Sequence, residues 1–93
     1  MIKRVELSKQ SRKDLRSVPS YIVDKLDSWV DAVERDGVEE IRKLLGYHDE
    51  PLHGQRQGQR SIRLSRSYRA IYIIRAGGKV EFVSVEEVTK HEY

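Results

Sequence analysis

The sequence ends in KHEY, a motif whose histidine and tyrosine could take part in chemistry on RNA. His91 could accept or donate a proton near neutral pH, because an unperturbed imidazole has a pKa of about 6.5. Tyr93 could stack on a base or orient an attacking hydroxyl. Glu50 offers a second candidate base, and Arg69 could donate charge-assisted hydrogen bonds to phosphoryl oxygens. Together these groups could cleave RNA without a metal ion, by attack of a 2′-hydroxyl on the adjacent phosphate.

Other charged residues could assist this set. Lys90 precedes the histidine, Glu92 follows it, and Arg63 is expected on a strand next to that of Arg69. The spacing alone does not bring these groups together, and a histidine and a tyrosine at a chain end could also belong to a frayed tail. Lys90 and Glu92 are therefore auxiliary candidates.

Alternative chemistries find less support in the sequence. The three histidines lack the spacing of zinc ligands, and cysteine is absent. We find no glycine-rich phosphate-binding loop and no serine nucleophile motif. We therefore expect neither a metal nor a cofactor.

Charge is strongly segregated along the chain, although the net charge is only +3. Residues 1–19 sum to +4, residues 20–50 to −5, residues 51–79 to +7 and residues 80–93 to −3. The third of these segments has seven basic residues and no acid. Such local density predicts a basic face suited to phosphates, with a merely solubilising surface as the alternative.

The length and composition are those of one small domain spanning residues 1–93. Hydrophobic residues make up 38% and charged residues 35%. No apolar run approaches the roughly 20 residues that cross a bilayer, and the first residues lack the apolar stretch of a signal peptide. We expect a soluble, cytoplasmic protein with no membrane partner.

The elements expected to position the candidate site begin with a strand over residues 2–7 and a basic helix over 8–19. Ser20 should cap a longer helix in which apolar residues recur at helical spacing, with Trp29 as a core anchor. Asp36 and Glu39 resemble a capping box at the start of a last helical stretch, VEEIRKLL. A loop should follow over residues 46–59.

Three strands are predicted after this loop, RSIRLS, YRAIYIIR and KVEFVSVEEV, with Gly77-Gly78 as the hairpin turn. Tyr68 and Tyr72 should pack in or beside the sheet. The predicted class is α+β, with an N-terminal strand and a helical hairpin packed on a small, mostly antiparallel twisted sheet. Helices should cover one face of the sheet and leave the concave face to the arginines.

The order of these parts resembles the RelE/ParE superfamily of type II toxin–antitoxin toxins, and most closely the RelE, YoeB and HigB-type mRNA interferases. The matching segments are EPLHG, GQRSIRLS, SYRAIYII and EVTKHEY. They follow the N-terminal strand and helices in the order of the family, so the resemblance covers essentially the whole chain. It implies the RelE-like fold and ribosome-dependent, metal-independent cleavage of mRNA, which inhibits translation.

The same resemblance implies roles for individual residues. Glu50 matches the glutamate proposed as general base, and Arg69 matches the phosphate-stabilising arginine. His91 would be the acid, and Tyr93 would orient the nucleotide or assist its hydroxyl. The sequence departs from YoeB-like toxins in one respect, since one residue separates its histidine and tyrosine. The residues expected to contact RNA or the ribosome are Arg12, Lys13, Arg16, Arg56, Arg60, Arg63 and Arg66.

The implied partners are the ribosome, mRNA and an acidic antitoxin of the RelB or HigA type, whose flexible segment would cover the basic face. The main alternative is a ParE-like protein that inhibits DNA gyrase by binding it, without catalysis. That branch generally lacks the acid–base set. A third possibility is a basic RNA-binding module without toxicity.

Overall fold

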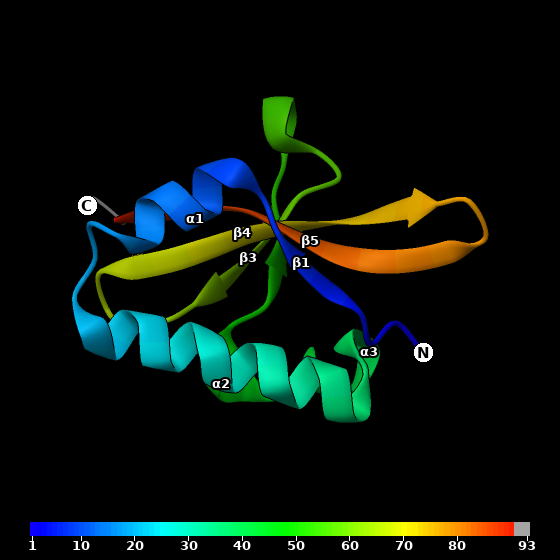
Figure 1. Ribbon diagram of the computed structural model, residues 1–93, viewed down its shortest axis with the longest axis horizontal. Helices are drawn as coiled ribbons and strands as arrows, with labels where there is room; N and C mark the ends of the chain where they lie inside the picture. The colour runs from blue at the N-terminus through cyan, green and yellow to red at the C-terminus, as the bar shows by residue number, and fades with distance from the viewer. Residues whose placement is uncertain (91–93) are drawn as a thin grey trace.

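The computed structural model describes residues 1–90, which form one five-stranded sheet with helices packed against it (Figure 1). His91, Glu92 and Tyr93 lie outside the described residues. The helices are α1 (Lys9–Leu15), α2 (Ser20–Asp36) and α3 (Val38–Ile41), and the strands are β1 (Val5–Leu7), β2 (Glu50–Pro51), β3 (Arg60–Arg63), β4 (Tyr68–Gly77) and β5 (Val80–Lys90). Two short 3₁₀ turns are η1 (Leu45–Tyr47) and η2 (Gly54–Arg56). The α+β prediction is confirmed.

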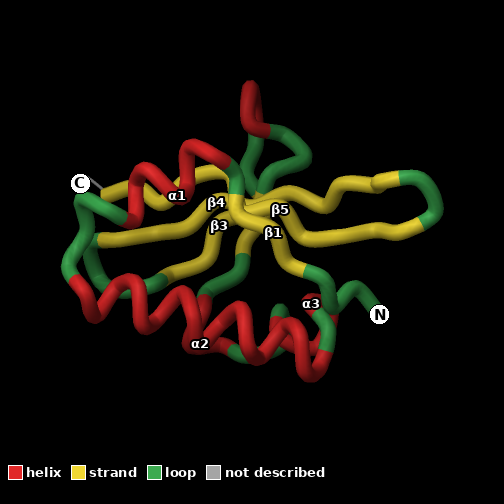
Figure 2. Tube along the Cα trace, in the orientation of Figure 1, coloured by secondary structure: helices red, strands yellow, loops and turns green. Residues whose placement is uncertain are grey.

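The strand order is β1-β5-β4-β3-β2, so the last strand lies between the first strand and the rest of the sheet (Figure 2). β1 runs parallel to β5, and the other three pairs are antiparallel. The β4–β5 hairpin turns at Gly78-Lys79, one residue later than predicted, because Gly77 still pairs with Val80. Gly78 has φ +67°, a value that glycine adopts without steric cost.

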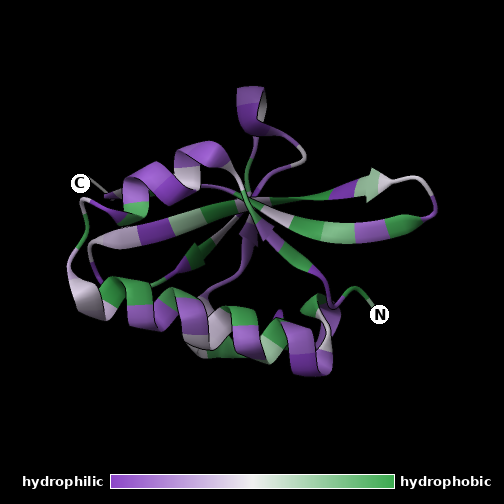
Figure 3. Cartoon of the chain, viewed as in Figure 1, coloured by the Kyte–Doolittle hydropathy of each residue, from purple (hydrophilic) through white to green (hydrophobic). Residues whose placement is uncertain are grey.

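The core lies between α2 and one face of the sheet, which we call the helix face. Polar and apolar segments alternate along α2 (Figure 3), and its apolar side chains pack against the sheet. Trp29 is fully buried with its ring centroid 5.3 Å from that of Tyr72, which confirms its predicted role as a core anchor. The buried side chains of the helix face are Ile62, Ala70, Tyr72, Val83, Val85 and Val88.

α1 lies along β5 beyond the end of β1, where it covers the edge of the sheet. The Ser8 amide donates to the Val85 carbonyl at 2.9 Å, and the Ser8 hydroxyl donates to the Glu86 carbonyl at 2.7 Å. The Val88 amide donates to the Asp14 carboxylate at 2.9 Å. These bonds replace a neighbouring strand, since open edges expose unpaired backbone groups. α1 therefore occupies the edge of the sheet, whereas we expected all helices on one face.

Two of the predicted helix starts are wrong. Pro19 precedes α2, whose first residue is Ser20, and no side chain caps this helix. Gly37, with φ +90°, precedes α3 in place of an Asp36 cap. Glu39 instead accepts a hydrogen bond from the Ile2 amide at 3.0 Å. Bonds from its own backbone amide and from that of Ile2 lower the pKa of Glu39. A contact distant in sequence has thus replaced a local capping box.

The predicted loop over residues 46–59 contains a short strand, β2, at the edge of the sheet. Glu50 pairs with Ser61 and Pro51 with Arg60. This pairing fixes the backbone of Glu50, and the proline suits an edge strand because it has no amide to donate. Within residues 1–90, no helix is both long enough and apolar enough to cross a membrane.

Candidate active site

The face of the sheet opposite the helix face, here called the outer face, has a hollow of about 350 Å³. Its lining residues come from four strands and from the turn between β2 and β3. They are Glu50, Leu52, Arg56, Ser61, Arg69, Ile71, Glu87 and Thr89. In Figure 1 this turn stands above the sheet, on the side opposite α2. The hollow thus lies on the face that the core leaves open.

The strand register brings Glu50 and Arg69 to this hollow. Glu50 lies opposite Ser61, and Ser61 lies opposite Ile71, so these three residues share a face across β2, β3 and β4. Arg69 is two residues before Ile71 and therefore points to the same face. The structure thus joins the predicted carboxylate and the predicted phosphate-binding arginine, 19 residues apart in sequence.

Arg69 is available to an anionic ligand as far as residues 1–90 are concerned. Its guanidinium lies 3.5 Å from the Ser61 hydroxyl, and no carboxylate in this part of the chain is within ion-pair distance. Arg56, which also lines the hollow, has an ion pair of 2.9 Å with Glu87. A partly buried guanidinium without a carboxylate is suited to bind a phosphate through two parallel hydrogen bonds.

Glu87 is a lining residue that the sequence reasoning missed. β5 has a bulge here, because Ile71 pairs with Glu87 while the next residue, Tyr72, pairs with Val85. The extra residue shifts the alternation, so that Glu87 points to the outer face and not to the core. The sequence signal for this shift is the spacing of the buried valines 83, 85 and 88, which changes from two to three.

Arg60 lies on the helix face, contrary to the expectation that the arginines share the concave face. It pairs with Tyr72 in the register, and its Nε donates to the Asp49 carboxylate at 2.5 Å. The physical reason is strand alternation: Arg60 is one residue from Ser61, whose side chain faces the hollow. Arg60 is therefore a structural partner of Asp49 and does not line the candidate site.

Three other predicted residues, Arg63, Arg66 and Lys90, also lie apart from the hollow. Arg63 is opposite Arg69, but its guanidinium extends to 3.4 Å from His48, and with Arg66 it lines a second hollow. Lys90 pairs with Tyr68, so alternation places it on the helix face, where it is exposed.

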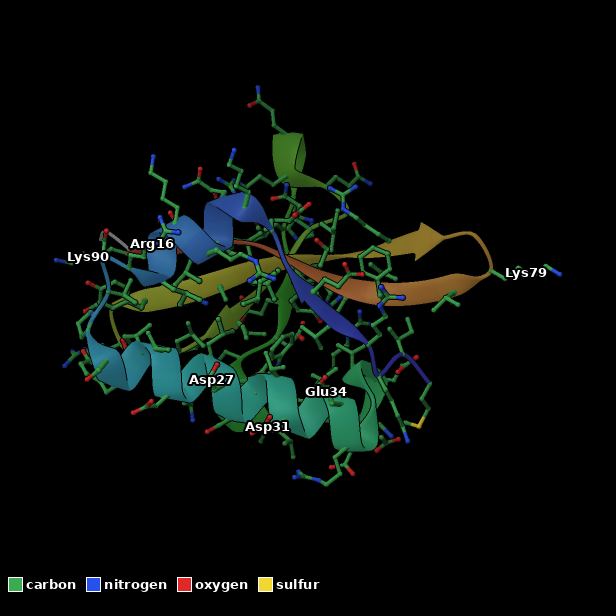
Figure 4. The ribbon with its side chains drawn as sticks, viewed as in Figure 1. Arg16, Asp27, Asp31, Glu34, Lys79 and Lys90 are labelled. Atoms are coloured by element: carbon green, nitrogen blue, oxygen red, sulfur yellow. The ribbon has the colours of Figure 1, made fainter. Side chains whose placement is uncertain are left out.

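Arg12 and Lys13 on α1, and Arg16 directly after this helix, are exposed to solvent. Figure 4 shows Arg16, at the end of α1, well apart from the acidic Asp27, Asp31 and Glu34, which lie along α2. The acidic residues of α2 thus lie on a different side of the molecule from Arg16. The remaining predicted residues, His91, Glu92 and Tyr93, are outside the described part of the chain.

The segment that carries Glu50 is fixed by a hydrogen-bonded network on the other side of the sheet. The Asp49 side chain is 1% exposed and accepts from Arg60 and, at 2.5 Å, from the Tyr72 hydroxyl. Arg42 in turn donates to that hydroxyl at 3.1 Å. Because Asp49 directly precedes Glu50, this network sets where β2 and its carboxylate lie.

Burial, and then the hydrogen bond to Asp49, raise the pKa of Tyr72 to about 12. The folded state therefore favours the neutral phenol. The resulting contribution to stability is fully present below pH 10 and is lost as the pH rises toward 12. We expect the free energy of unfolding to fall by about 2 kcal/mol over this range. Denaturant unfolding at several pH values would measure the fall.

Two variants test this assignment. Tyr72→Phe should flatten the alkaline dependence, whereas Tyr21→Phe, at an exposed tyrosine, should leave it unchanged. If the free energy of unfolding of Tyr72→Phe fell with pH as much as that of the wild type, another group would be responsible.

The described residues also bear on metal binding. Within residues 1–90, no group of three or more histidine, cysteine, aspartate or glutamate side chains could hold a metal ion. The hollow itself has two carboxylates and two guanidinium groups. This set can exchange protons and bind an anion, which are the requirements of phosphodiester cleavage.

Comparison of the sequence with protein-family profiles and with curated proteins gives no match. Solved structures with the same architecture are, however, clearly similar. A YoeB/ParE toxin from Agrobacterium tumefaciens has a TM-score of 0.71 at 21% identity, over 96% of this chain and 99% of that one. The E. coli DinJ–YafQ toxin–antitoxin complex gives 0.71 at 22% identity, over 97% and 94%. The RelBE2 toxin–antitoxin complex from Mycobacterium tuberculosis gives 0.69 at 20% identity, over 98% and 100%.

The chain therefore has the fold of the RelE/ParE superfamily of toxins. The resemblance seen in the sequence is confirmed at the level of the fold over nearly the whole chain.

Proposed function

We propose that this protein is the toxin of a type II toxin–antitoxin system and cleaves mRNA on the ribosome. The observation that carries the proposal is the convergence of Glu50 and Arg69 on one hollow of the outer face. These are the two described residues that the resemblance to mRNA interferases assigns to catalysis.

In the proposed reaction, Glu50 accepts the proton of a ribose 2′-hydroxyl as its oxygen attacks the adjacent phosphorus. Arg69 donates hydrogen bonds to the phosphoryl oxygens, whose negative charge grows in the transition state. The bond from phosphorus to the 5′-oxygen breaks, and His91 supplies the proton that this oxygen takes up. Tyr93 orients the nucleotide. The products are a 2′,3′-cyclic phosphate and a free 5′-hydroxyl.

Binding to the ribosome would involve the basic residues on α1 and directly after it. Arg12 and Lys13 on α1 and Arg16 directly after it are exposed, and Figure 1 draws α1 above the sheet and α2 below it. Phosphate contacts of this kind orient a protein on RNA without reading its sequence. We propose ribosomal RNA as the target of these three residues, and mRNA as the occupant of the hollow that Arg56 lines.

We also propose an acidic antitoxin as the protein partner. Two of the similar structures, DinJ–YafQ and RelBE2, are toxin–antitoxin complexes. A flexible acidic segment laid over the outer face would neutralise its arginines and exclude mRNA from the hollow.

The experiment that tests this function is mRNA cleavage in a reconstituted ribosome complex. The wild-type protein should cut mRNA in the decoding site, whereas His91→Ala and a form without Tyr93 should lose at least about 100-fold in rate. Thermal unfolding of each variant controls for folding. Full cleavage by both variants would contradict the assigned residues, and a toxic wild type that induces DNA damage without any cleavage would favour a gyrase inhibitor.

A further inference from the structure

The carboxylate of Glu87 is one of the groups that line the hollow. It accepts a hydrogen bond from Arg56 at 2.9 Å, and the two side chains retain 30% and 52% of their exposure. Arg56 also donates to the Gln59 side chain at 3.2 Å. Of the two arginines that line the hollow, one is therefore already paired with a carboxylate.

The fold places Glu87 in this position through the bulge in β5. With regular alternation from Val85, residue 87 would point into the core and residue 86 would be the one on the outer face. The extra residue puts Glu86 and Glu87 on the outer face together and returns Val88 to the core. Bulges that redirect a side chain in this way are common beside functional sites.

The other partner, Arg56, lies on a short turn with glycines at both sides. Gly54 has φ +67° and Gly58 has φ +94°, and a Cβ atom at either would meet nothing within 4 Å. The turn thus extends from the sheet without being packed at these two points. The ion pair between Arg56 and Glu87 of β5 holds this turn toward the hollow.

We propose that Glu87 holds, in the free protein, the place on Arg56 that an RNA phosphodiester takes when it enters the hollow. This inference rests on the proposed function, in which RNA is the substrate. The incoming phosphate replaces the Glu87 carboxylate as the anionic partner of Arg56. The Glu87 side chain then moves away, because its negative charge is repelled by that of the phosphate. Exchange favours ligands with a phosphate placed to replace the carboxylate, and it disfavours uncharged ones.

The inference is tested by the binding of a six-nucleotide RNA with a 2′-O-methyl group on every ribose, which cannot be cleaved. Fluorescence anisotropy with the full chain would give the dissociation constant. Glu87→Gln should bind roughly two- to five-fold more tightly than the wild type, because an exposed ion pair no longer has to break. In an Arg56→Gln background the same change should have no effect, since the two residues act as a pair.

Glu86→Gln is the matched control. It removes the same charge from the same bulge, but Glu86 pairs with Arg75 at 2.5 Å and does not line the hollow. If Glu86→Gln and Glu87→Gln increased the affinity for RNA equally, the effect would come from overall charge, and the inference would be overturned. Unchanged or weaker binding by Glu87→Gln would also overturn it. If the binding pattern holds while the wild type cuts no mRNA, the proposed function fails and the inference about Glu87 stands.

Discussion

Replacing Arg69 by glutamine is expected to lower the rate of the proposed mRNA cleavage on the ribosome by roughly 100- to 1,000-fold. The residue lines the hollow beside Glu50 and lacks a carboxylate partner within residues 1–90, so its charge is directed to the ligand. The loss should appear in kcat more than in KM, because negative charge on the phosphoryl oxygens is greatest in the transition state. Single-turnover cleavage would separate chemistry from binding.

Two further variants sharpen this prediction. Arg69→Lys keeps the charge but loses the planar pair of donors, so it should recover only part of the rate. Arg75→Gln removes the same charge from the same strand, at a residue that pairs with Glu86 and not with the hollow. A comparable loss in Arg75→Gln would mean that positive charge on the sheet matters only in bulk.

Replacing Asp49 by alanine should lower the free energy of unfolding by about 3 kcal/mol, and the Tm by roughly 10 to 20 °C. The carboxylate is almost fully buried and accepts from both Arg60 and Tyr72. Its removal leaves a guanidinium and a phenol without their partner inside the protein. Calorimetry and denaturant unfolding would measure the change.

Asp49→Ala should also lower the rate of the proposed mRNA cleavage at temperatures where the variant is folded, since Glu50 follows Asp49 in the chain. Asp31→Ala provides the comparison, because this aspartate is exposed on α2 and its loss should stay within about 0.5 kcal/mol. Equal stability of the two variants would show that the network around Asp49 contributes little to folding.

The parts of the fold that the sequence predicts well are those set by local pattern. The helical recurrence from Ile22 to Val33 gives α2 and places Trp29 in the core, because one helix face must be buried. Alternation likewise gives β4 and β5. The hairpin between them was predicted within one residue, since its glycines permit the turn.

The parts that it predicts poorly depend on contacts distant in sequence. β2 has only two residues, and its pairing with β3 shows no local pattern. The face on which Arg60 lies follows from the register, and a shift by one residue would reverse it. The bulge at Glu87 could have been found from the spacing of three valines, but the ion pair with Arg56 could not, because it joins a turn and a strand 31 residues apart.

The parallel pairing of β1 with β5 has a consequence for the synthesis of the protein. Val5, Glu6 and Leu7 are translated before the other strands of the sheet, yet their partners are residues 83–85. Throughout translation of the segments between them, the N-terminal strand has no sheet to join, and β4 has an open edge. The fold can therefore close only late, when β5 inserts between the two strands. A nascent chain that lacks β5 also lacks Glu87 and Thr89, and its hollow is therefore incomplete until the last strand is made.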